Sequence, residues 1–307
     1  MTGIVFIGFP KGVEKIRNAA TAAFFVEKRN STFNFIRIKP IANFCGIFIP
    51  SKISKCMKVV IIGSGNAATV LGRLIKKAGH DIIQVYSRSI GHAKQLANEL
   101  KCSAVDKAEL IELHADIYMA ALLDDTLIEL DKMFQLGDKL IVHTAGSGTI
   151  EVLKNVSSRY GVLYPLQTLR KEMKAPAEIP LLIDGNTEET IETITAFAKT
   201  ISPLVYHMSD TERGKMHLMA VVVNNFTNHL FDLAYDYCKK ENIDFKALYP
   251  IIDETVERIR TYPPCDVQTG PAKRNDSRTL SKHLRWLTDY PRLKYLYLKI
   301  SESIMGR

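Results

Sequence analysis

A glycine-rich turn between a short apolar run and an amphipathic segment constrains the fold more than any other feature of the sequence. Residues 58–62 (Lys-Val-Val-Ile-Ile) are β-branched and apolar after the first position, which is typical of a strand covered on both faces. The run breaks at Gly63-Ser64-Gly65. Apolar residues then recur at helical spacing, at Ala67, Val70, Leu71, Leu74, Ile75 and Ala78. The sequence therefore predicts a strand, a tight turn and a helix in direct succession.

The alternation of strand and helix continues to about residue 206. Short apolar runs predict further strands at 82–86, 103–105, 115–122, 140–143, 161–164, 181–183 and 205–206. Helical patterns lie between some of them, at 92–100, 126–134 and 188–199. This order predicts an α/β domain over residues 57–206 with a doubly wound, mostly parallel Rossmann sheet.

The pattern changes after residue 206, where the strand signals end. Three helical stretches are expected at 216–237, 247–262 and 281–304, the last broken at Asp289-Tyr290-Pro291. The first of them is apolar over more than one stripe, which suits a helix buried in a bundle or in a dimer interface. We therefore expect an all-α C-terminal domain over residues 207–307 that forms a homodimer.

Residues 1–56 differ in composition from the rest of the chain. They carry nine Lys or Arg and two acidic residues, whereas the other 251 residues carry 32 basic and 31 acidic side chains. The first 56 residues are expected to be a poorly ordered extension, either non-native, with Met57 as the functional start, or of targeting type. A folded role for them is the alternative.

Composition also limits the partners and the compartment. The near-neutral body offers no broad basic field for nucleic acid, and no apolar stretch is long enough to span a membrane. Five scattered cysteines show no metal-binding spacing, which favours a reducing, cytoplasmic setting without zinc. Nucleic-acid and membrane partners are therefore not expected.

The turn after residue 62 has the chemistry of a dinucleotide site. In the pattern Gly63-x-Gly65-x-x-Ala68, the first glycine permits the turn, the second lets a pyrophosphate approach, and the small third position brings helix and strand together. The amides at the start of the helix would face the phosphates. The residues expected to line this turn are Gly63, Ser64, Gly65, Asn66, Ala67 and Ala68.

The end of the second strand indicates which cofactor is bound. It reads Ser87-Arg88-Ser89 and has no acidic residue for a ribose 2′-hydroxyl. A guanidinium flanked by hydroxyls suits a 2′-phosphate, so NADP is the expected cofactor.

Other predicted strands end at the same edge of the sheet. Leu122, Leu123 and Asp124 close the fourth strand and are expected to contact the cofactor, although Asp124 or Asp125 could instead cap the next helix. His143 and Ser147 follow the fifth strand and are expected among the cofactor contacts. Ser147 could meet nicotinamide or substrate, and His143 could instead be structural. Residues 164–168 close the sixth strand at the same edge, where they could either contact a ligand or have a structural role.

The first C-terminal helix carries polar residues on an apolar background. At about 100° per residue, His217, Asn224 and Asn228 would lie within about 40° of one another. They could bond neighbouring helices, or they could hold substrate. In the second case His217 would donate a proton or orient the substrate, with Asn224, Asn225 and Asn228 as polar contacts. Lys215 is an alternative proton donor but is more typical of a solvated residue.

Four motifs together resemble one group of proteins. They are Gly63-Ser64-Gly65-Asn66-Ala67-Ala68, His143 with Gly146-Ser147-Gly148, His217 with Asn225-Phe226-Thr227-Asn228-His229-Leu230, and Gln268-Thr269-Gly270-Pro271-Ala272 with Arg274 and Asp276. The group comprises Rossmann-like oxidoreductases with a helical C-terminal domain. It is similar to pyrroline-5-carboxylate reductase and to deazaflavin-dependent NADP reductases within the 6-phosphogluconate dehydrogenase-like superfamily.

The resemblance covers residues 57–307 and implies an NADP-binding domain, a helical dimerisation domain and a site between them. The implied activity is an NADP(H)-dependent oxidoreductase that transfers a hydride between nicotinamide and a small imine or carbonyl compound. A non-catalytic NADP-binding regulatory protein is the alternative. Many superfamily members place Lys and Asn four residues apart on the first long helix, but here Met219 follows Lys215 at that spacing, so the hydroxyacid-dehydrogenase mechanism does not transfer.

Overall fold

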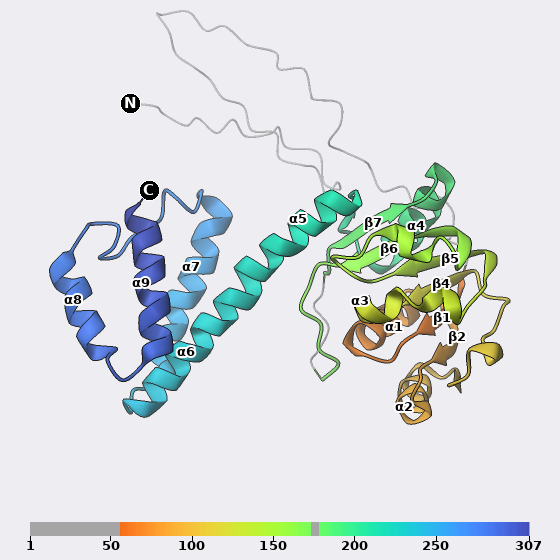
Figure 1. Ribbon diagram of the computed structural model, residues 1–307, viewed down its shortest axis with the longest axis horizontal. Helices are drawn as coiled ribbons and strands as arrows, with labels where there is room; N and C mark the ends of the chain where they lie inside the picture. The colour runs from red at the N-terminus through yellow and green to blue at the C-terminus, as the bar shows by residue number, and fades with distance from the viewer. Residues whose placement is uncertain (1–55, 173–177, 307) are drawn as a thin grey trace, which may run out of the picture. The chain divides into compact units, whose positions relative to one another are not determined.

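A computed structural model describes residues 56–172 and 178–306 (Figure 1). Residues 1–55 lie outside the described residues. The expectation for the segment 1–56 therefore stays a prediction. The described residues begin just before the first strand, β1 (Lys58–Ile62), and end after the last helix, α9 (Pro291–Met305).

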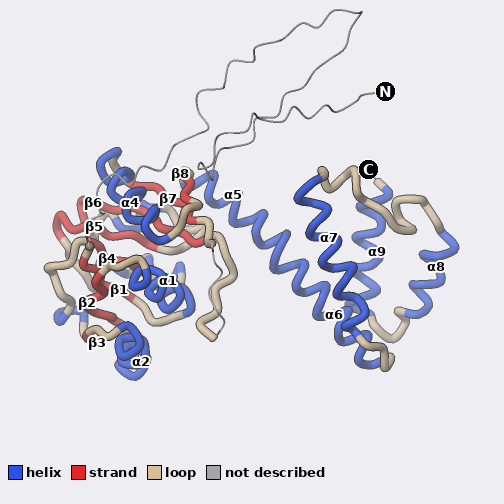
Figure 2. Tube along the Cα trace, turned by 180° about the vertical axis from the view of Figure 1, so that it is seen from behind, coloured by secondary structure: helices blue, strands red, loops and turns tan. Residues whose placement is uncertain are grey.

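Within the described residues, the first part is built around a single eight-stranded sheet (Figures 1 and 2). After β1, its strands are β2 (Asp81–Tyr86), β3 (Ser103–Val105), β4 (Ile117–Ala120), β5 (Gly137–His143), β6 (Ser157–Pro165), β7 (Leu181–Gly185) and β8 (Val205–His207). Their order is β3-β2-β1-β4-β5-β6-β7-β8. From β1, strands β2 and β3 are added on one side, and the chain then returns to add β4 and the later strands on the other side. This is the doubly wound arrangement that the sequence predicts.

The β6–β7 pair is antiparallel, and every other pair in the sheet is parallel. Its register places Tyr164 opposite Leu182 and Gly161 opposite Gly185. Gly161 is needed there because a Cβ atom would lie 2.2 Å from the Asp184 carbonyl oxygen. The prediction of a mostly parallel sheet is confirmed.

Both faces of the sheet are covered, as the apolar strands require. One core contains Val59 and Ile61 with side chains of α1 (Asn66–Lys77), α2 (Ile90–Leu100) and α4 (Glu188–Ile201). The other contains Val60 and Ile62 with side chains around the short helices α3 (Asp124–Leu127), η2 (Leu130–Lys132) and η3 (Ile150–Leu153). A further short turn, η1 (Ala108–Leu110), follows β3. Alternate residues of β1 thus serve opposite cores, because side chains alternate across a strand.

Helices alone follow β8, which confirms the all-α C-terminal region. They are α5 (Asp210–Ala220), η4 (Val221–Phe226), α6 (Thr227–Lys240), η5 (Phe245–Leu248), α7 (Tyr249–Thr261), α8 (Ser277–Trp286) and α9. A capping box starts α5: the Ser209 side chain accepts from the Glu212 amide, and the Glu212 carboxylate accepts from Ser209. The predicted break at 289–291 is the turn between α8 and α9.

The segment η4 is π-helical and joins α5 to α6 without a gap in the chain. A π-helix has more residues per turn than the α-helix assumed for the polar stripe, so the expected 40° alignment of His217, Asn224 and Asn228 is wrong. Residues on the two sides of η4 are rotated relative to that expectation.

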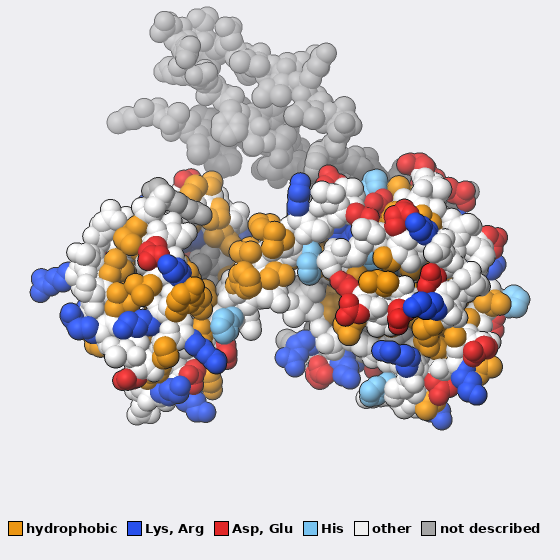
Figure 3. All heavy atoms as spheres, viewed as in Figure 1, with side chains coloured by type: hydrophobic (Ala, Val, Ile, Leu, Met, Phe, Trp, Pro, Cys, Tyr) orange, Lys and Arg blue, Asp and Glu red, His pale blue; other side chains and the backbone are white. Residues whose placement is uncertain are grey.

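The C-terminal helices bury little of their apolar surface. Between residues 208 and 306, the buried side chains are Arg213, Cys238, Ala272, Leu287 and Ser301. Every helix of this region exposes large hydrophobic side chains, although on α8 this is Trp286 alone, at the end of the helix. Figure 3 shows such side chains crowded along α5 and over the helices that follow. Within the described ranges, no helix is both long and apolar enough to cross a membrane.

Candidate functional site

The turn between β1 and α1 is built for a backbone that approaches another group closely. Gly63 has φ +116°, and a Cβ atom there would lie 2.3 Å from the Ala121 carbonyl oxygen. Its amide donates to the Tyr86 carbonyl at 2.8 Å, which ties the turn to the end of β2. A side chain at Gly63 is therefore excluded by both conformation and space.

Gly65 has the opposite environment, because a Cβ atom there would meet nothing within 4 Å. It is the N-cap of α1, has no side-chain cap, and is followed by a first turn without acidic residues. The space in front of Gly65 and the amino end of α1 thus form a cradle suited to an anion.

A cavity of about 490 Å³ opens over this turn. It is lined by the carboxyl ends of successive strands of the sheet and the short helix after β4, namely Gly63–Ala67, Tyr86–Arg88, Ala121–Asp124, Thr126, Leu130, Met133, Phe134, Thr144 and Ala145. Of the residues proposed from sequence for the cofactor, the cavity brings together Gly63, Ser64, Gly65, Asn66, Ala67, Ser87, Arg88, Leu122, Leu123 and Asp124. Ala68 is instead buried on α1, in the core that contains Val59 and Ile61.

At one end of the cavity, two hydroxyls meet beside a cation. The Ser64 hydroxyl donates to the Ser87 hydroxyl at 3.0 Å, and the side chain of Arg88 is exposed next to them. Ser89 is the N-cap of α2 and its side chain makes no capping bond. Hydroxyls, an exposed guanidinium and the start of a helix are a donor set that suits a phosphate monoester.

Asp124 and Ser147 lie at another part of the rim. The Ser147 hydroxyl donates to the Asp124 carboxylate, so the ends of β4 and β5 are joined there. The alternative in which Asp124 caps α3 is wrong, because Leu123 is the N-cap and no side chain caps this helix. The short helix leaves the Asp124 carboxylate free to hold Ser147.

His143 is fully buried at the end of β5 and is not among the residues that line the cavity. Its Nδ1 accepts a hydrogen bond from the Ala145 amide at 3.1 Å, so the ring supports the turn that follows β5. Burial, reinforced by the charge of Arg213, lowers the pKa of His143 to about 4. These contacts favour the structural alternative for His143 over cofactor contact.

The buried His143 is expected to make the fold acid-sensitive. Its pKa is about 4 in the folded chain and near 6.5 in the unfolded chain, so the unfolded state binds the proton first as pH falls. The contribution of the neutral, buried His143 to the free energy of unfolding is complete above pH 6.5 and is lost as pH falls towards 4. Roughly 2 kcal/mol of it should already be lost at pH 5. Urea unfolding at pH 7.5 and pH 5 measures the difference.

His143→Asn is the matched control, since its side-chain oxygen can still accept from the Ala145 amide but does not titrate. In this variant, the difference in unfolding free energy between pH 7.5 and pH 5 should be smaller by roughly 2 kcal/mol. An equal pH dependence in both proteins would exclude His143 as the acid-sensitive group.

A tyrosine and a histidine form a hydrogen-bonded pair beside the cavity. The Tyr164 hydroxyl, at the end of β6, lies 2.8 Å from His217 Nδ1 on α5, and the two rings meet edge to face. Both side chains are half-buried. Gly146 packs against the pair, because a Cβ atom there would lie 2.7 Å from His217 Nδ1 and 2.9 Å from Tyr164 Cζ. Ala145, its neighbour in sequence, lines the cavity.

The asparagines proposed for the site are brought together only in part. Asn224, within η4, donates to the Thr168 hydroxyl after β6, and its amide lies 3.5 Å from Asn225 Oδ1. Asn228 is exposed on α6, beyond the π-helical turn, and Lys215 is exposed on α5. His217 thus contacts the end of β6 and Asn224 contacts the segment that follows it, whereas no contact of Asn228 with either is seen among the described residues.

Sequence reasoning missed two participants in this arrangement. Tyr164 was placed at the correct edge of the sheet but not paired with His217, 53 residues away. Arg213 was not considered, although it is fully buried and donates to the Gly148 carbonyl. The spacing Asp210-x-x-Arg213-x-x-x-His217, which places all three on neighbouring turns of one helix, could have drawn attention to it.

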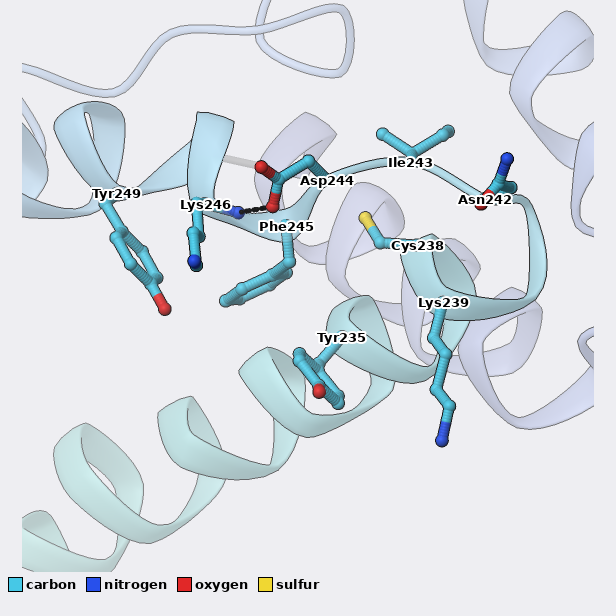
Figure 4. A pocket seen from close by; sticks show the side chains of 9 residues that line it. All are labelled: Tyr235, Cys238, Lys239, Asn242, Ile243, Asp244, Phe245, Lys246 and Tyr249. Atoms are coloured by element: carbon cyan, nitrogen blue, oxygen red, sulfur yellow. Dashed lines mark hydrogen bonds between the residues drawn. The ribbon is translucent and has the colours of Figure 1, made fainter.

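A second cavity of about 540 Å³ lies at the turn from α6 to α7 (Figure 4). Tyr235, Phe245 and Tyr249 contribute aromatic rings, and the Lys246 amide donates to the Asp244 carboxylate at 3.0 Å. None of the described polar atoms that are buried without a partner belongs to it. Nor does any cluster of potential metal ligands occur in the described ranges. We therefore place the functional site at the sheet edge.

Known protein families match both parts of the described chain. A family model described as NADP oxidoreductase, coenzyme F420-dependent, matches residues 58–146, and a domain of unknown function (DUF2520) matches residues 179–304. No curated protein matches the chain.

Solved structures of similar chains extend over both regions. A protein from Bacteroides fragilis described as a "putative NADP oxidoreductase" is 36% identical, with 82% of this chain and 99% of that chain covered and a TM-score of 0.76. 1-Pyrroline-5-carboxylate reductase from Streptococcus pyogenes is 14% identical, with 82% and 99% covered and a TM-score of 0.55. A reductive aminase from Aspergillus terreus, in complex with NADPH and ethyl levulinate, is 17% identical, with 82% and 95% covered and a TM-score of 0.58. The last two likenesses concern the fold alone.

Proposed function

The chain belongs to the NADP oxidoreductase family represented by the Bacteroides fragilis protein, and on that premise we propose that it reduces a small imine or carbonyl compound with NADPH. The observation that carries the proposal is the Tyr164–His217 pair beside the cavity over the glycine turn. A proton donor next to a dinucleotide cradle is what reduction of a C=N or C=O bond requires.

The residues of the cavity fit NADPH. The open cradle at Gly65 and the uncapped start of α1 would hold the pyrophosphate, and Ser64, Ser87 and Arg88 would hold the 2′-phosphate. Leu122, Leu123 and Asp124 would contact the half of the cofactor that extends across the strand ends. When bound, the reduced nicotinamide supplies a hydride to the substrate carbon.

Tyr164 and His217 would supply the proton. In reduction of an imine or carbonyl, the nitrogen or oxygen needs a proton as hydride reaches the carbon. Burial raises the pKa of Tyr164, which keeps the hydroxyl protonated and able to donate at neutral pH. His217, bonded to that hydroxyl through Nδ1, would orient it and return a proton from solvent. Asn224 and Asn225 would contact substrate beside Thr168.

The experiment that tests the proposal is NADPH oxidation across a panel of cyclic imines, amine–ketone mixtures and keto acids. We expect turnover with at least one member, and deuterium on the former imine or carbonyl carbon of the product when NADPH deuterated at the transferred C4 position is used. NADPH binding by calorimetry without turnover on any member would favour a non-catalytic NADP-binding regulatory protein. No heat with either NADPH or NADH would contradict the cofactor site itself.

Arg88→Gln is expected to weaken NADPH binding by about 10- to 100-fold, because a charge-assisted bond to the 2′-phosphate is lost. NADH lacks that phosphate, so its affinity should not change. Calorimetric titration of both cofactors measures the effect. Lys94→Gln removes one positive charge from an exposed position on α2 and serves as the control. Equal weakening of both cofactors by Arg88→Gln would mean that the guanidinium does not read the 2′-position.

The C-terminal helices would be covered by a second copy of the chain. On α7, every residue except Ile252 is exposed, including Ile251, Val256 and Ile259. A 13-residue helix is marginal without tertiary packing, and apolar side chains on one face need a partner surface. The aromatic rings around the cavity of Figure 4 continue that surface towards α6. We infer a homodimer formed by these helices, with the small-molecule substrate bound at the sheet edge.

A further inference from the structure

Arg213 is a charged side chain in an unusual place. It lies in the first turns of α5 and its guanidinium is 0% exposed. Its Nη2 donates to Asp210 Oδ1 at 2.6 Å and to the Gly148 carbonyl, while Nε and Nη1 have no hydrogen-bond partner among the described residues. A buried guanidinium that is only half satisfied costs stability, so a structural salt bridge alone is a poor reason for it.

The neighbours of Arg213 connect it to the Tyr164–His217 pair. His217 is four residues along α5 and therefore on the same side of the helix. The turn after β5 lies against that side: Gly146 contacts His217 and Tyr164, Gly148 accepts from Arg213, and the Ile150 amide donates to Asp210 at 3.2 Å. Asp210 and Arg213 thus fix the turn to the helix that carries His217.

The charge of Arg213 also acts on Tyr164. Burial raises the pKa of the phenol, and Arg213 opposes that rise. The other ionisable groups around the pair are Asp210, which is ion-paired with Arg213, His217, which is hydrogen-bonded to the phenol, and His143, whose low pKa keeps it neutral. Arg213 is therefore the positive charge that favours the ionised form of Tyr164.

We propose that Arg213 is a positioning residue of the reductive site, which holds the turn after β5 against α5 and stabilises the phenolate left when Tyr164 donates its proton. The inference rests on the proposed function, since it concerns the same protonation step. In that step the Tyr164 O–H bond breaks, the proton goes to the substrate nitrogen or oxygen, and the electron pair stays on the phenolate oxygen. NADPH is the reductant, and a proton from solvent restores the phenol.

The test measures the ionisation of Tyr164 directly and needs no turnover. The chain is labelled with 3-fluorotyrosine, whose ring fluorine lowers the phenol pKa into a range where the fold survives, and fluorine NMR follows each tyrosine against pH. The Tyr164 signal is the one that Tyr164→Phe removes. Arg213→Gln should raise the apparent pKa of Tyr164 by about one unit, and Arg213→Lys, which keeps the charge, should restore most of the difference.

Asp210→Asn provides a second variant with the opposite expectation. It removes the carboxylate that neutralises Arg213, so the apparent pKa of Tyr164 should fall. Opposite shifts in Arg213→Gln and Asp210→Asn support the inference, and the Asp210→Asn arm remains decisive if Arg213→Gln does not fold. An unchanged Tyr164 pKa in the variants that fold would overturn it.

Kinetics separates this inference from the proposed function. With a substrate from the NADPH panel, Arg213→Gln should lower kcat by up to about tenfold and leave the KM for NADPH unchanged, with recovery in Arg213→Lys. If no substrate turns over but both pKa shifts occur, the proposed reaction fails while the electrostatic role of Arg213 stands. If turnover occurs without any shift, the reaction stands and the role of Arg213 fails.

Discussion

Tyr164→Phe is expected to lower kcat by about 10²- to 10⁴-fold, the usual range for loss of a general acid. The variant keeps the ring that meets His217 edge to face and removes only the hydroxyl that lies 2.8 Å from Nδ1. NADPH affinity should be unchanged, because Tyr164 does not line the cavity over the glycine turn. The loss therefore belongs to the chemical step and not to cofactor binding.

Single-turnover reduction at saturating NADPH measures this effect without a contribution from product release. Tyr206→Phe is the matched control, since it removes a phenol hydroxyl from an exposed residue of β8. His217→Ala should also lower kcat with little change in NADPH binding, as it leaves the phenol without its partner. A Tyr164→Phe variant with wild-type kcat would exclude Tyr164 as the proton donor, and His217 would then be the remaining candidate.

The fold was predictable wherever it depended on short-range patterns. The strand, turn and helix around Gly63 follow from a β-branched run, two glycines and helical spacing within about twenty residues. The same kind of pattern predicts the strands at 82–86, 115–122 and 140–143, which end at Tyr86, Ala120 and His143 in the structure, and with them the edge at which the cavity lies. The family matches also confirm the resemblance drawn from the four motifs.

The candidate site was less predictable because it depends on contacts between distant segments. A strand pattern places Tyr164 at the sheet edge, but only the packing of α5 brings His217 to its hydroxyl. The same is true of Asn224 and Thr168, which are 56 residues apart. The periodicity argument for the asparagines failed for a local reason, since it assumed α-helical geometry across a stretch that is π-helical.

Arg213 shows a limit of residue-type reasoning. Arginine is seldom fully buried, so an arginine near the start of a helix is read as solvent-exposed unless a partner is known. Its partners here are a carboxylate one turn earlier and a backbone carbonyl 65 residues away. The first is visible in sequence, but the second, which ties Arg213 to the turn after β5, is not.

Ile259→Asp combined with Val256→Asp is expected to abolish the dimer proposed for the C-terminal helices. Ile252, Val256 and Ile259 recur at spacings of four and three residues and so share one face of α7. Burying each side chain stabilises the dimer by about 1.5–3 kcal/mol, and a buried carboxylate without a partner reverses that contribution. Light scattering coupled to size exclusion should report the mass of one 34.5 kDa chain for the variant and of two for the wild type.

Glu257→Gln is the control for this change, because Glu257 points away from the apolar face of α7 and the substitution alters charge without touching that face. The chain that carries both Ile259→Asp and Val256→Asp should also have a lowered midpoint of unfolding at all protein concentrations. The wild-type midpoint should rise with protein concentration, since a dimer is stabilised by mass action. A doubly substituted chain that stays dimeric would show that α7 is not the interface. A wild-type chain that is monomeric at micromolar concentration would leave the exposed side chains of α7 without the partner that a 13-residue helix needs, and would contradict the homodimer itself.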